Sequence, residues 1–263
     1  MTGSDDVLFH IGDHIAYVTL NRPEHGNALT AAMMRRFRDI WTAIGSDPEV
    51  RCVLLSASGD RHFCTGADLH DVARTGSVAA GLGPVSQELF LTSRHNGVWK
   101  PTVCAVNGLV AGAGLHFVVD ADIVVASSAA AFLDSHVNVG MVGAVENVGL
   151  AKRLPLGTAL RMTLQGRNFR LSAARAHQLG LVEEVVEPMA LQQVAEQIAH
   201  DISLNSPQAV SLSQQAVWAG LDMGYPAAQE YGYALVRMHW QHPDFGEGPR
   251  AFTEGRRPVW TTS

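Results

Sequence analysis

Two glycine-rich segments hold the residues whose types and spacing suit chemistry best. Residues 63–69 read FCTGADL, and residues 107–116 read NGLVAGAGLH. In each segment small residues stand where a strand should end and a helix begin, so unpaired N–H groups can face an anion or an oxyanion. Glycines at either position would equally allow a tight turn without any ligand. Two such junctions that converge would form an oxyanion hole, which stabilises negative charge on a carbonyl oxygen.

Several common catalytic signatures are missing from the chain. The sequence has no GxxxxGK, no GxGxxG after an expected strand, no GxSxG and no HExxH. Nucleotide hydrolysis, Rossmann-type redox chemistry and zincin-type proteolysis therefore lose their simplest support.

The elements that must position these segments alternate between strand and helix. Apolar, β-rich runs predict strands, and apolar residues at helical spacing after Thr30 predict a helix that ends near Gly45. Asp68 is expected to cap the helix that follows the first junction. The expected strands span residues 14–20, 50–56, 102–106, 123–126 and 131–133. Because each strand is almost wholly apolar, the pattern predicts an α/β sheet covered on both faces.

Three further segments complete the expected organisation. Residues 57–66 are interpreted as a loop, and residues 74–87 as an irregular insertion that could line a pocket. Strand signals stop after Pro188, and three helices are expected over residues 191–204, 207–221 and 226–240. The sequence thus predicts an α/β core over residues 1–200 and a helical region over residues 201–263.

Composition limits the classes of partner. The 263 residues carry 19 Lys and Arg against 25 Asp and Glu, a net charge of −6, so nucleic acid and anionic membranes are not expected partners. The low charged fraction, 17%, is typical of chains with buried subunit interfaces. Three cysteines without metal-ligand spacing, no basic N-terminal segment and no long apolar run predict an unprocessed protein of the cytoplasm, without disulfides. No metal site is expected, because His116 and His136 have no carboxylate or cysteine partners at ligand spacing.

The chain resembles the crotonase superfamily, the enoyl-CoA hydratase/isomerase family, almost from end to end. Residues 19–24 (TLNRPE) with 27–30 (NALT) are similar to its N-terminal signature, and residues 63–69 and 106–115 to its two oxyanion loops. Residues 161–180 are similar to a later helical segment of the family, and residues 244–258 to its C-terminal signature. The resemblance implies a crotonase-like spiral of ββα units, with C-terminal helices that assemble the chain into a homotrimer or hexamer.

The resemblance also implies where an acyl-CoA substrate would bind. Backbone N–H groups of Ala67 and Ala113 would hold the thioester oxygen. Arg22, Asn27, Ala28 and Leu29 would lie along the CoA moiety, and Arg256 or Arg257 would reach its phosphates, from a neighbouring subunit if necessary. CoA enters as part of the substrate, and no separate cofactor is expected.

One departure from the family pattern bears directly on the reaction. Hydratases of the family use two glutamates, and the matching positions here hold His116 and His136. Glu146 lies in a loop that carries catalytic acids in some isomerases and hydrolases of the superfamily. An imidazole with a pKa near 6.5 serves as a base when neutral and as an acid when protonated. The pair could therefore move protons, although not as two glutamates would.

Several reactions remain open from the sequence. An enoyl-CoA hydratase-like hydro-lyase is the first reading, because that activity is the commonest in the family. In a second reading, His136, oriented by Asp134 or Glu146, activates water in a thioester or β-diketone-type C–C hydrolase. In a third, Glu146 serves a double-bond isomerase. The loss of both glutamates also allows a non-catalytic protein that binds CoA.

Overall fold

A six-stranded sheet forms the centre of the protein in the computed structural model, which describes residues 6–76 and 83–261. Its strand order is β1-β2-β3-β5-β7-β10, and every neighbouring pair is parallel except the antiparallel pair β1 and β2. The strands are β1 (Val7–Gly12), β2 (Ile15–Leu20), β3 (Cys52–Ala57), β5 (Thr102–Val106), β7 (Ile123–Ser127) and β10 (Glu184–Val186). The predicted strands over residues 14–20, 50–56, 102–106 and 123–126 are confirmed.

A second, four-stranded sheet holds the two junctions. Its strands, in order, are β4 (His62–Cys64), β6 (Leu109–Ala111), β8 (Ala131–Leu133) and β9 (Leu171–Ser172). The prediction of a loop over residues 57–66 is therefore wrong, because β4 lies within it and pairs with β6. Strands of two or three residues are too short for a periodic signal.

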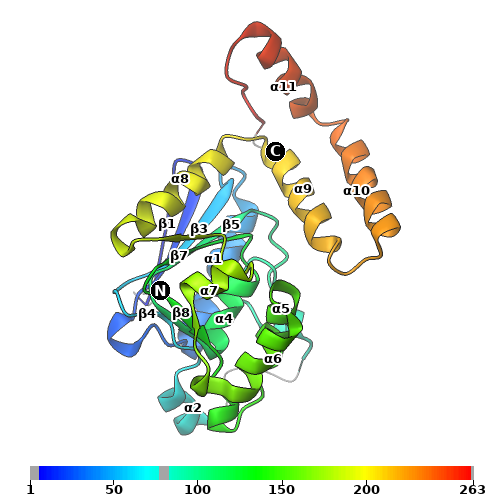
Figure 1. Ribbon diagram of the computed structural model, residues 1–263. Helices are drawn as coiled ribbons and strands as arrows, with labels where there is room; N and C mark the ends of the chain where they lie inside the picture. Colours follow the sequence, from blue (N-terminus) through cyan, green and yellow to red (C-terminus); the bar gives the residue numbers. More distant parts are fainter. Residues whose placement is uncertain (1–5, 77–82, 262–263) are drawn as a thin grey trace.

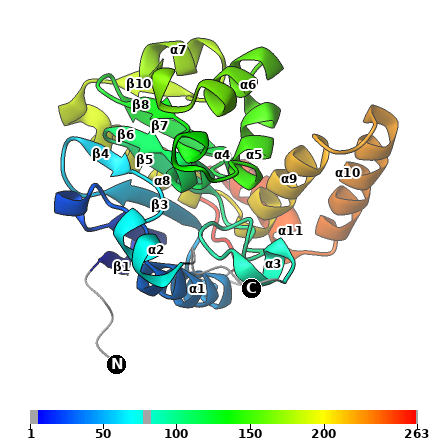
Figure 2. The ribbon, with the colours of Figure 1, turned by 90° about the horizontal axis from the view of Figure 1, so that it is seen from below.

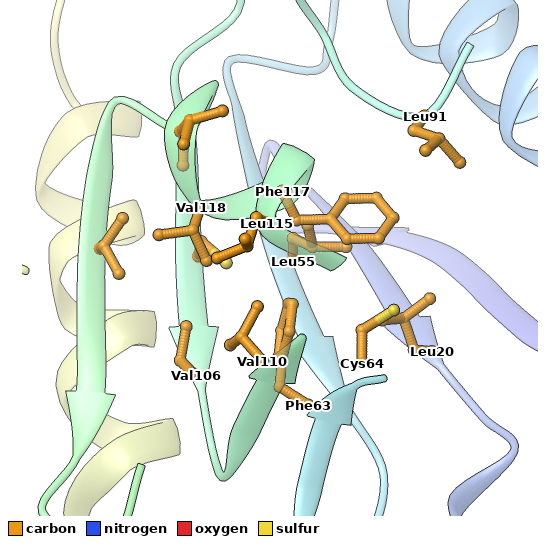
Figure 3. Close-up of a cluster of buried hydrophobic side chains, with 14 of the residues drawn as sticks. Leu20, Leu55, Phe63, Cys64, Leu91, Val106, Val110, Leu115, Phe117 and Val118 are labelled. Atoms are coloured by element: carbon orange, nitrogen blue, oxygen red, sulfur yellow. The ribbon is translucent and has the colours of Figure 1, made fainter. Parts of the chain in front are cut away.

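Helices cover both faces of the central sheet, as the apolar strands predicted. One face packs against α1 and α4, where the ring of Phe117 contacts the rings of Phe37 and Phe63 in the main core. Figure 3 shows Phe63 and Phe117 in this core. The other face packs against α8. The helices of the core are α1 (Ala31–Ser46), α2 (Leu69–Thr75), α3 (Val85–Glu88), α4 (Leu115–Val119), α5 (Val145–Arg153), α6 (Leu156–Gln165), α7 (Ala173–Gln178) and α8 (Leu191–Ser203), joined by the short 3₁₀ turns η1 (Pro23–His25), η2 (Gly112–Gly114), η3 (His136–Val139), η4 (Gly166–Asn168) and η5 (Pro188–Ala190).

The segment over residues 74–87 is more regular than expected. Helix α2 continues to Thr75, and α3 occupies Val85–Glu88, while residues 77–82 lie outside the described chain. Asp68 caps α2 by accepting from the N–H groups of His70 and Asp71, as the sequence predicted. Gly76 follows α2 with a φ of 69°, which ends the helix.

Three helices form an arm that extends away from the core (Figure 1). They are α9 (Pro207–Ala219), α10 (Tyr225–His239) and α11 (Pro243–Glu254), of which the sequence predicted the first two. The arm joins the core at Asp122, whose carboxylate accepts hydrogen bonds from Thr102 N–H, Gln214 and Trp218, each at 2.7 Å. The sequence analysis divided the chain after residue 200, a position inside α8. None of the described helices is both long and apolar enough to span a bilayer.

Candidate active site

The two junctions meet in space. The N–H of Leu29 donates to Gly66 O at 2.8 Å and the N–H of Asp68 to Leu29 O at 3.0 Å, so this parallel bridge leaves the Ala67 N–H facing away from Leu29. A Cβ added at Gly66 would lie 3.1 Å from the backbone N of Ala113. Ala67 and Ala113 line the same cavity. The convergence that the sequence analysis required of an oxyanion hole is therefore present.

Glycine is needed for this close approach. Gly66 has a φ of 93°, which side chains other than glycine rarely adopt, and its Cβ would also lie 3.0 Å from Ala111 O. Gly112 has a φ of 52°, and its Cβ would lie 3.5 Å from Cε1 of His136. The second junction thus lies directly beside one of the candidate catalytic histidines.

His136 belongs to a buried histidine–carboxylate pair. Its Nδ1 lies 2.6 Å from Oδ1 of Asp134, and Asp134 Oδ2 accepts from Asn147 Nδ2 at 2.7 Å. Asn147 also donates to Thr163 at 3.0 Å, which fixes its amide. Because Asp134 occupies Nδ1, the nitrogen of His136 left for other chemistry is Nε2.

Glu146 lies between the two histidines. Its Oε1 is 3.1 Å from Nδ1 of His136, and its Oε2 is 3.3 Å from Nε2 of His116. The Glu146 side chain is only 6% exposed, and Oε1 has no hydrogen-bond partner among the described residues. Helices α4 and α5, which carry His116 and Glu146, lie side by side (Figure 2). All three catalytic candidates from the sequence therefore come together.

Burial and hydrogen bonding shift the pKa values of this group. Burial raises the pKa of Glu146 and lowers that of His116 to about 3. The hydrogen bond that His136 donates to Asp134 raises the pKa of His136. Burial alone would raise the pKa of Asp134, but hydrogen bonds from His136 and Asn147 outweigh burial and lower it. The low pKa of His116 keeps it uncharged at neutral pH, whereas the raised pKa values of His136 and Glu146 make these two the candidates for proton transfer.

A largely apolar cavity of about 530 Å³ contains these groups. Its polar lining consists of His116, His136 and Glu146, next to the two amides. The remaining lining residues are Met34, Val72, Gly76, Leu89, Leu91, Met141 and Val142. The expectation that the segment over residues 74–87 lines a pocket is met at Gly76.

The N-terminal residues expected along CoA support the first junction. Nη1 of Arg22 donates to Ala28 O at 2.7 Å and to Asp68 at 3.2 Å. Asn27 is fully buried with a φ of 54°. Its Oδ1 accepts from the N–H of Arg22, and its Nδ2 donates to Ser58 O, in the loop before β4, and to His62 O, in β4. Leu29 bridges to the junction itself. Contact between these residues and CoA stays a prediction.

The two arginines expected at the CoA phosphates lie in the arm. Arg256 pairs with Glu247 at 2.6 Å and with Glu254 at 2.5 Å, and Arg257 is exposed. Within the described chain, no arm residue lines the cavity. A single chain therefore does not bring Arg256 or Arg257 to the other site residues, and a role from a neighbouring subunit stays a prediction.

Sequence reasoning missed the polar residues that surround the histidines. The sequence analysis assigned no role at the site to Asn147 or Asp120. Instead, Asp120 accepts a hydrogen bond from Thr92 at 2.6 Å and lies 3.5 Å from His95. No spacing in the sequence signals these contacts, because the partners come from separate elements.

Among residues 6–76 and 83–261, two groups combine imidazole and carboxylate donors within 4.8 Å of one another: Asp134, His136 and Glu146, and His95, His116 and Asp120. The sequence analysis predicted no metal site because neither histidine had a carboxylate at ligand spacing. That argument does not hold in space, since carboxylates lie beside both histidines, and such donors suit zinc. The absence of a metal stays a prediction.

Comparison with known proteins agrees with the fold. A family model described as Enoyl-CoA hydratase/isomerase matches residues 10–263. The chain belongs to this family. The family assignment, and with it the crotonase-type fold, confirms the resemblance found in the sequence.

Individual members of the enoyl-CoA hydratase/isomerase family align over nearly their full length. The chain is 33% identical to (E)-benzylidenesuccinyl-CoA hydratase of Thauera aromatica, over 97% of this chain and 98% of that protein. It is 31% identical to 1,2-epoxyphenylacetyl-CoA isomerase of Escherichia coli, over 97% and 98%. A crystal structure of an enoyl-CoA hydratase/isomerase from Mycobacterium paratuberculosis superposes with a TM-score of 0.88 at 35% identity, covering 98% of this chain and 99% of that one.

Proposed function

We propose that this protein is an enoyl-CoA hydratase-like enzyme that adds water across the double bond of an enoyl-CoA thioester. The proposal rests on one observation above all, the convergence of His136, Glu146 and the amides of Ala67 and Ala113 on one cavity. Names of relatives that act on CoA thioesters, both hydratases and isomerases, support the substrate class. CoA is part of this substrate, and no separate cofactor is invoked.

The two amides activate the thioester. They donate to its oxygen, which draws electron density from the double bond and stabilises the enolate that forms when water attacks Cβ. Fixed donors in a site that excludes water lower the barrier by about 3 kcal/mol each. The apolar lining of the cavity excludes water around the acyl chain, which strengthens these hydrogen bonds.

His136 and Glu146 then move the protons. His136 Nε2 takes a proton from water as the oxygen bonds to Cβ, and Asp134 stabilises the imidazolium through Nδ1. Glu146, whose pKa is raised by burial, delivers its proton to Cα of the enolate. One proton is accepted and one donated, so the balance is the addition of H₂O. Because His136 and Glu146 are neighbours, one proton shared between them suffices.

A mass-spectrometric turnover assay tests this function. The substrates are a panel of enoyl-CoA, β-ketoacyl-CoA and cyclic β-diketone compounds. A gain of about 18 Da on an enoyl-CoA, lost in His136→Ala and His116→Ala but kept in His200→Ala, is the expected result. His200 lies exposed on α8 and serves as the matched control. Silence across the panel with CoA still bound would instead identify a non-catalytic member of the family.

A hydrolase is the second candidate, and one observation favours it. The 2.6 Å contact between His136 and Asp134 resembles the histidine–carboxylate pairs that activate a nucleophile for attack on a carbonyl carbon. The same two amides would then hold a tetrahedral oxyanion. In the assay, free CoA or a cleaved acyl chain would identify this reaction, whereas a shifted double bond at unchanged mass would identify a Glu146-dependent isomerase.

We also propose that the protein assembles into a homotrimer or hexamer in the cytoplasm. The apolar side chains exposed on the arm support assembly, because a free apolar surface of this kind usually meets a partner. Cys52, Cys64 and Cys104 are buried and unpaired, which is typical of a reducing compartment. Light scattering decides the assembly: a monomeric mass would contradict it.

A further inference from the structure

A second histidine–carboxylate pair packs against His116 and takes no part in the cavity lining. Asp120 follows His116 by one turn at the end of α4, and His95 contacts both residues. The rings of His95 and His116 are 5.1 Å apart between centroids, edge to face at 70°. Nε2 of His95 lies 3.5 Å from Oδ2 of Asp120. His95 therefore spans the face of α4 that presents His116.

The backbone that carries His95 is itself fixed. Thr92 donates its hydroxyl to Asp120 at 2.6 Å and accepts the N–H of His95 at 3.3 Å. Nδ2 of Asn96 donates to Phe90 O at 2.9 Å and to Thr92 O at 2.7 Å, which closes the turn. The loop before β5 is thus attached to α4 through its own polar groups.

The polarity of His95 needs a reason, because packing alone would favour an apolar ring. Its side chain is only 9% exposed, and Nδ1 has no hydrogen-bond partner within the described residues. A buried polar atom without a partner costs about 1–3 kcal/mol. The opposite nitrogen faces Asp120, so the contact that compensates is the one to this carboxylate.

His116 needs support of this kind. Its Nε2 is 3.3 Å from Glu146. This single contact lies at one atom of the ring and does not fix the plane of the ring by itself. We propose that His95, held by Asp120, is a positioning residue that fixes the ring of His116 against Glu146. The inference rests on the proposed function, in which Glu146 must present its proton to the substrate in one orientation.

The charges around His116 agree with this role. The titratable groups around it are His95, Asp120, Glu146 and His136. Burial is the main cause that lowers the pKa of His116, and charge on His95 or His136 lowers it further. Burial also lowers the pKa of His95. Both rings therefore stay neutral near pH 7, and His116 can keep a single tautomer.

Two substitutions test the inference. His95→Phe keeps an aromatic ring against His116 but removes the nitrogen that faces Asp120, and Asp120→Asn keeps the shape but removes the charge. Each is expected to lower kcat by about 10- to 100-fold, by analogy with the partners that orient metal-binding histidines, with KM changed less than about twofold. His200→Phe, the same chemical change at an exposed site, is expected to leave both constants unchanged.

A spectroscopic measurement separates this inference from the proposed function. ¹⁵N NMR of the ring nitrogens of His116 is expected to show one tautomer in the wild type and a mixture in both variants, with the titration moved to higher pH in His95→Phe. The result does not require turnover, so it holds or fails even if no substrate in the panel reacts. Circular dichroism checks that each variant is folded. If His95→Phe does not fold, Asp120→Asn alone provides the test.

Three results would overturn the inference. The first is a kcat, a pH profile and His116 ring shifts that all match the wild type in both variants. The second is a loss of thermal stability with an unchanged His116 tautomer, which would make His95 only a packing residue. The third is one equivalent of zinc in the purified wild type that His95→Phe lacks, which would make His95 a metal ligand.

Discussion

The catalytic cluster and the C-terminal arm differ in how completely a single chain buries their side chains. In the cluster, Asp134, His116 and Glu146 are buried, and every one of them contacts another group of the same chain. In the arm, Val217 is 73% exposed and Phe252 is 85% exposed, and no described side chain of α10 is buried. The groups of the cluster contact one another within a single chain, whereas the arm presents an exposed apolar surface, for which we have proposed a partner chain.

The arm nevertheless has a polar framework of its own. Buried Asp244 accepts from Ser206 at 2.5 Å and from the Thr261 hydroxyl at 2.8 Å, and Glu247 accepts from Arg256 and the N–H of Val259. These bonds close the chain end onto the start of α9. The difference between the regions therefore concerns apolar contacts and not order: the arm has a fixed shape but lacks its own core. Five changes test how far the two regions are independent.

The largest effect is expected from His136→Ala. Removal of a positioned general base lowers a rate by about 10²- to 10⁴-fold, so kcat on the responsive enoyl-CoA should fall by that factor. The arm should be unaffected, and the mass by light scattering should equal that of the wild type. Activity retained at more than a tenth of wild type would remove His136 from the mechanism.

Gly66→Ala should affect catalysis almost as strongly. The added Cβ would lie 3.0 Å from Ala111 O and 3.1 Å from Ala113 N, so the two junctions must separate and the oxyanion donors lose their alignment. Loss of one such donor costs about 10²- to 10³-fold in kcat. Gly180→Ala is the matched control, because Gly180 has a φ of 85° but its Cβ meets nothing within 4 Å. Equal losses in both variants would indicate backbone strain alone.

The pH profile of kcat/KM should be bell-shaped. Below the optimum a second proton enters the His136–Glu146 pair, and above it the last proton leaves, so each limb changes about tenfold per pH unit. Asp134→Asn removes the hydrogen bond that raises the pKa of His136, so the neutral base persists to lower pH and the acid limb should move down. A limb that stays in place would show that His136 does not control it.

Arm substitutions should change assembly more than chemistry. Val217→Asp and Phe252→Asp place charge on the exposed apolar face and should lower the mass measured by light scattering. We expect kcat to change less than about threefold, because no described arm residue lines the cavity. KM should rise if Arg256 or Arg257 reaches CoA from a neighbouring chain. Leu8→Asp, on exposed β1 of the core, provides the comparison.

Metal removal is expected to have the smallest effect. Exhaustive dialysis against EDTA should leave kcat within about twofold, because the proposed chemistry uses amides, His136 and Glu146 only. A loss of activity that added Zn²⁺ restores would assign a metal to one of the two histidine–carboxylate groups. That outcome would replace the proton-sharing mechanism with metal-assisted activation of water.

Much of the fold could be predicted because many of its elements are long enough to show a hydrophobic period in the sequence. The six-residue apolar strands and the sixteen-residue helix α1 carry clear periods, and Thr30 and Asp68 mark helix starts as expected. The missed elements include β1, of six residues, and α11, of twelve. The other missed strands are short: β4, β6 and β10 have three residues each and β9 has two. Their positions depend on pairing between distant segments, which no local window contains.

The candidate site shows the same difference between residues that a sequence pattern marks and residues that no pattern marks. His116, His136 and Glu146 were found because family motifs align them, and the structure brings them within 3.3 Å contacts. Asn147 and His95 carried no motif, and each acts on a partner 13 or 21 residues away in the sequence. Hydrogen bonds made by single polar side chains leave no periodic pattern, so orientation of the catalytic groups could not be predicted.

The contacts of Asp122 also affect the order in which parts of the chain fold. The core strands and α8 precede residue 204, so they leave the ribosome before the arm does and can pack first. The indole of Trp218 then docks on Asp122 across 96 residues of sequence, which is among the slowest kinds of contact to form. Stopped-flow fluorescence of Trp218, with the other four tryptophans replaced, should therefore show a late phase in refolding. Until that phase is complete, the arm cannot present its apolar face to another chain in a fixed direction.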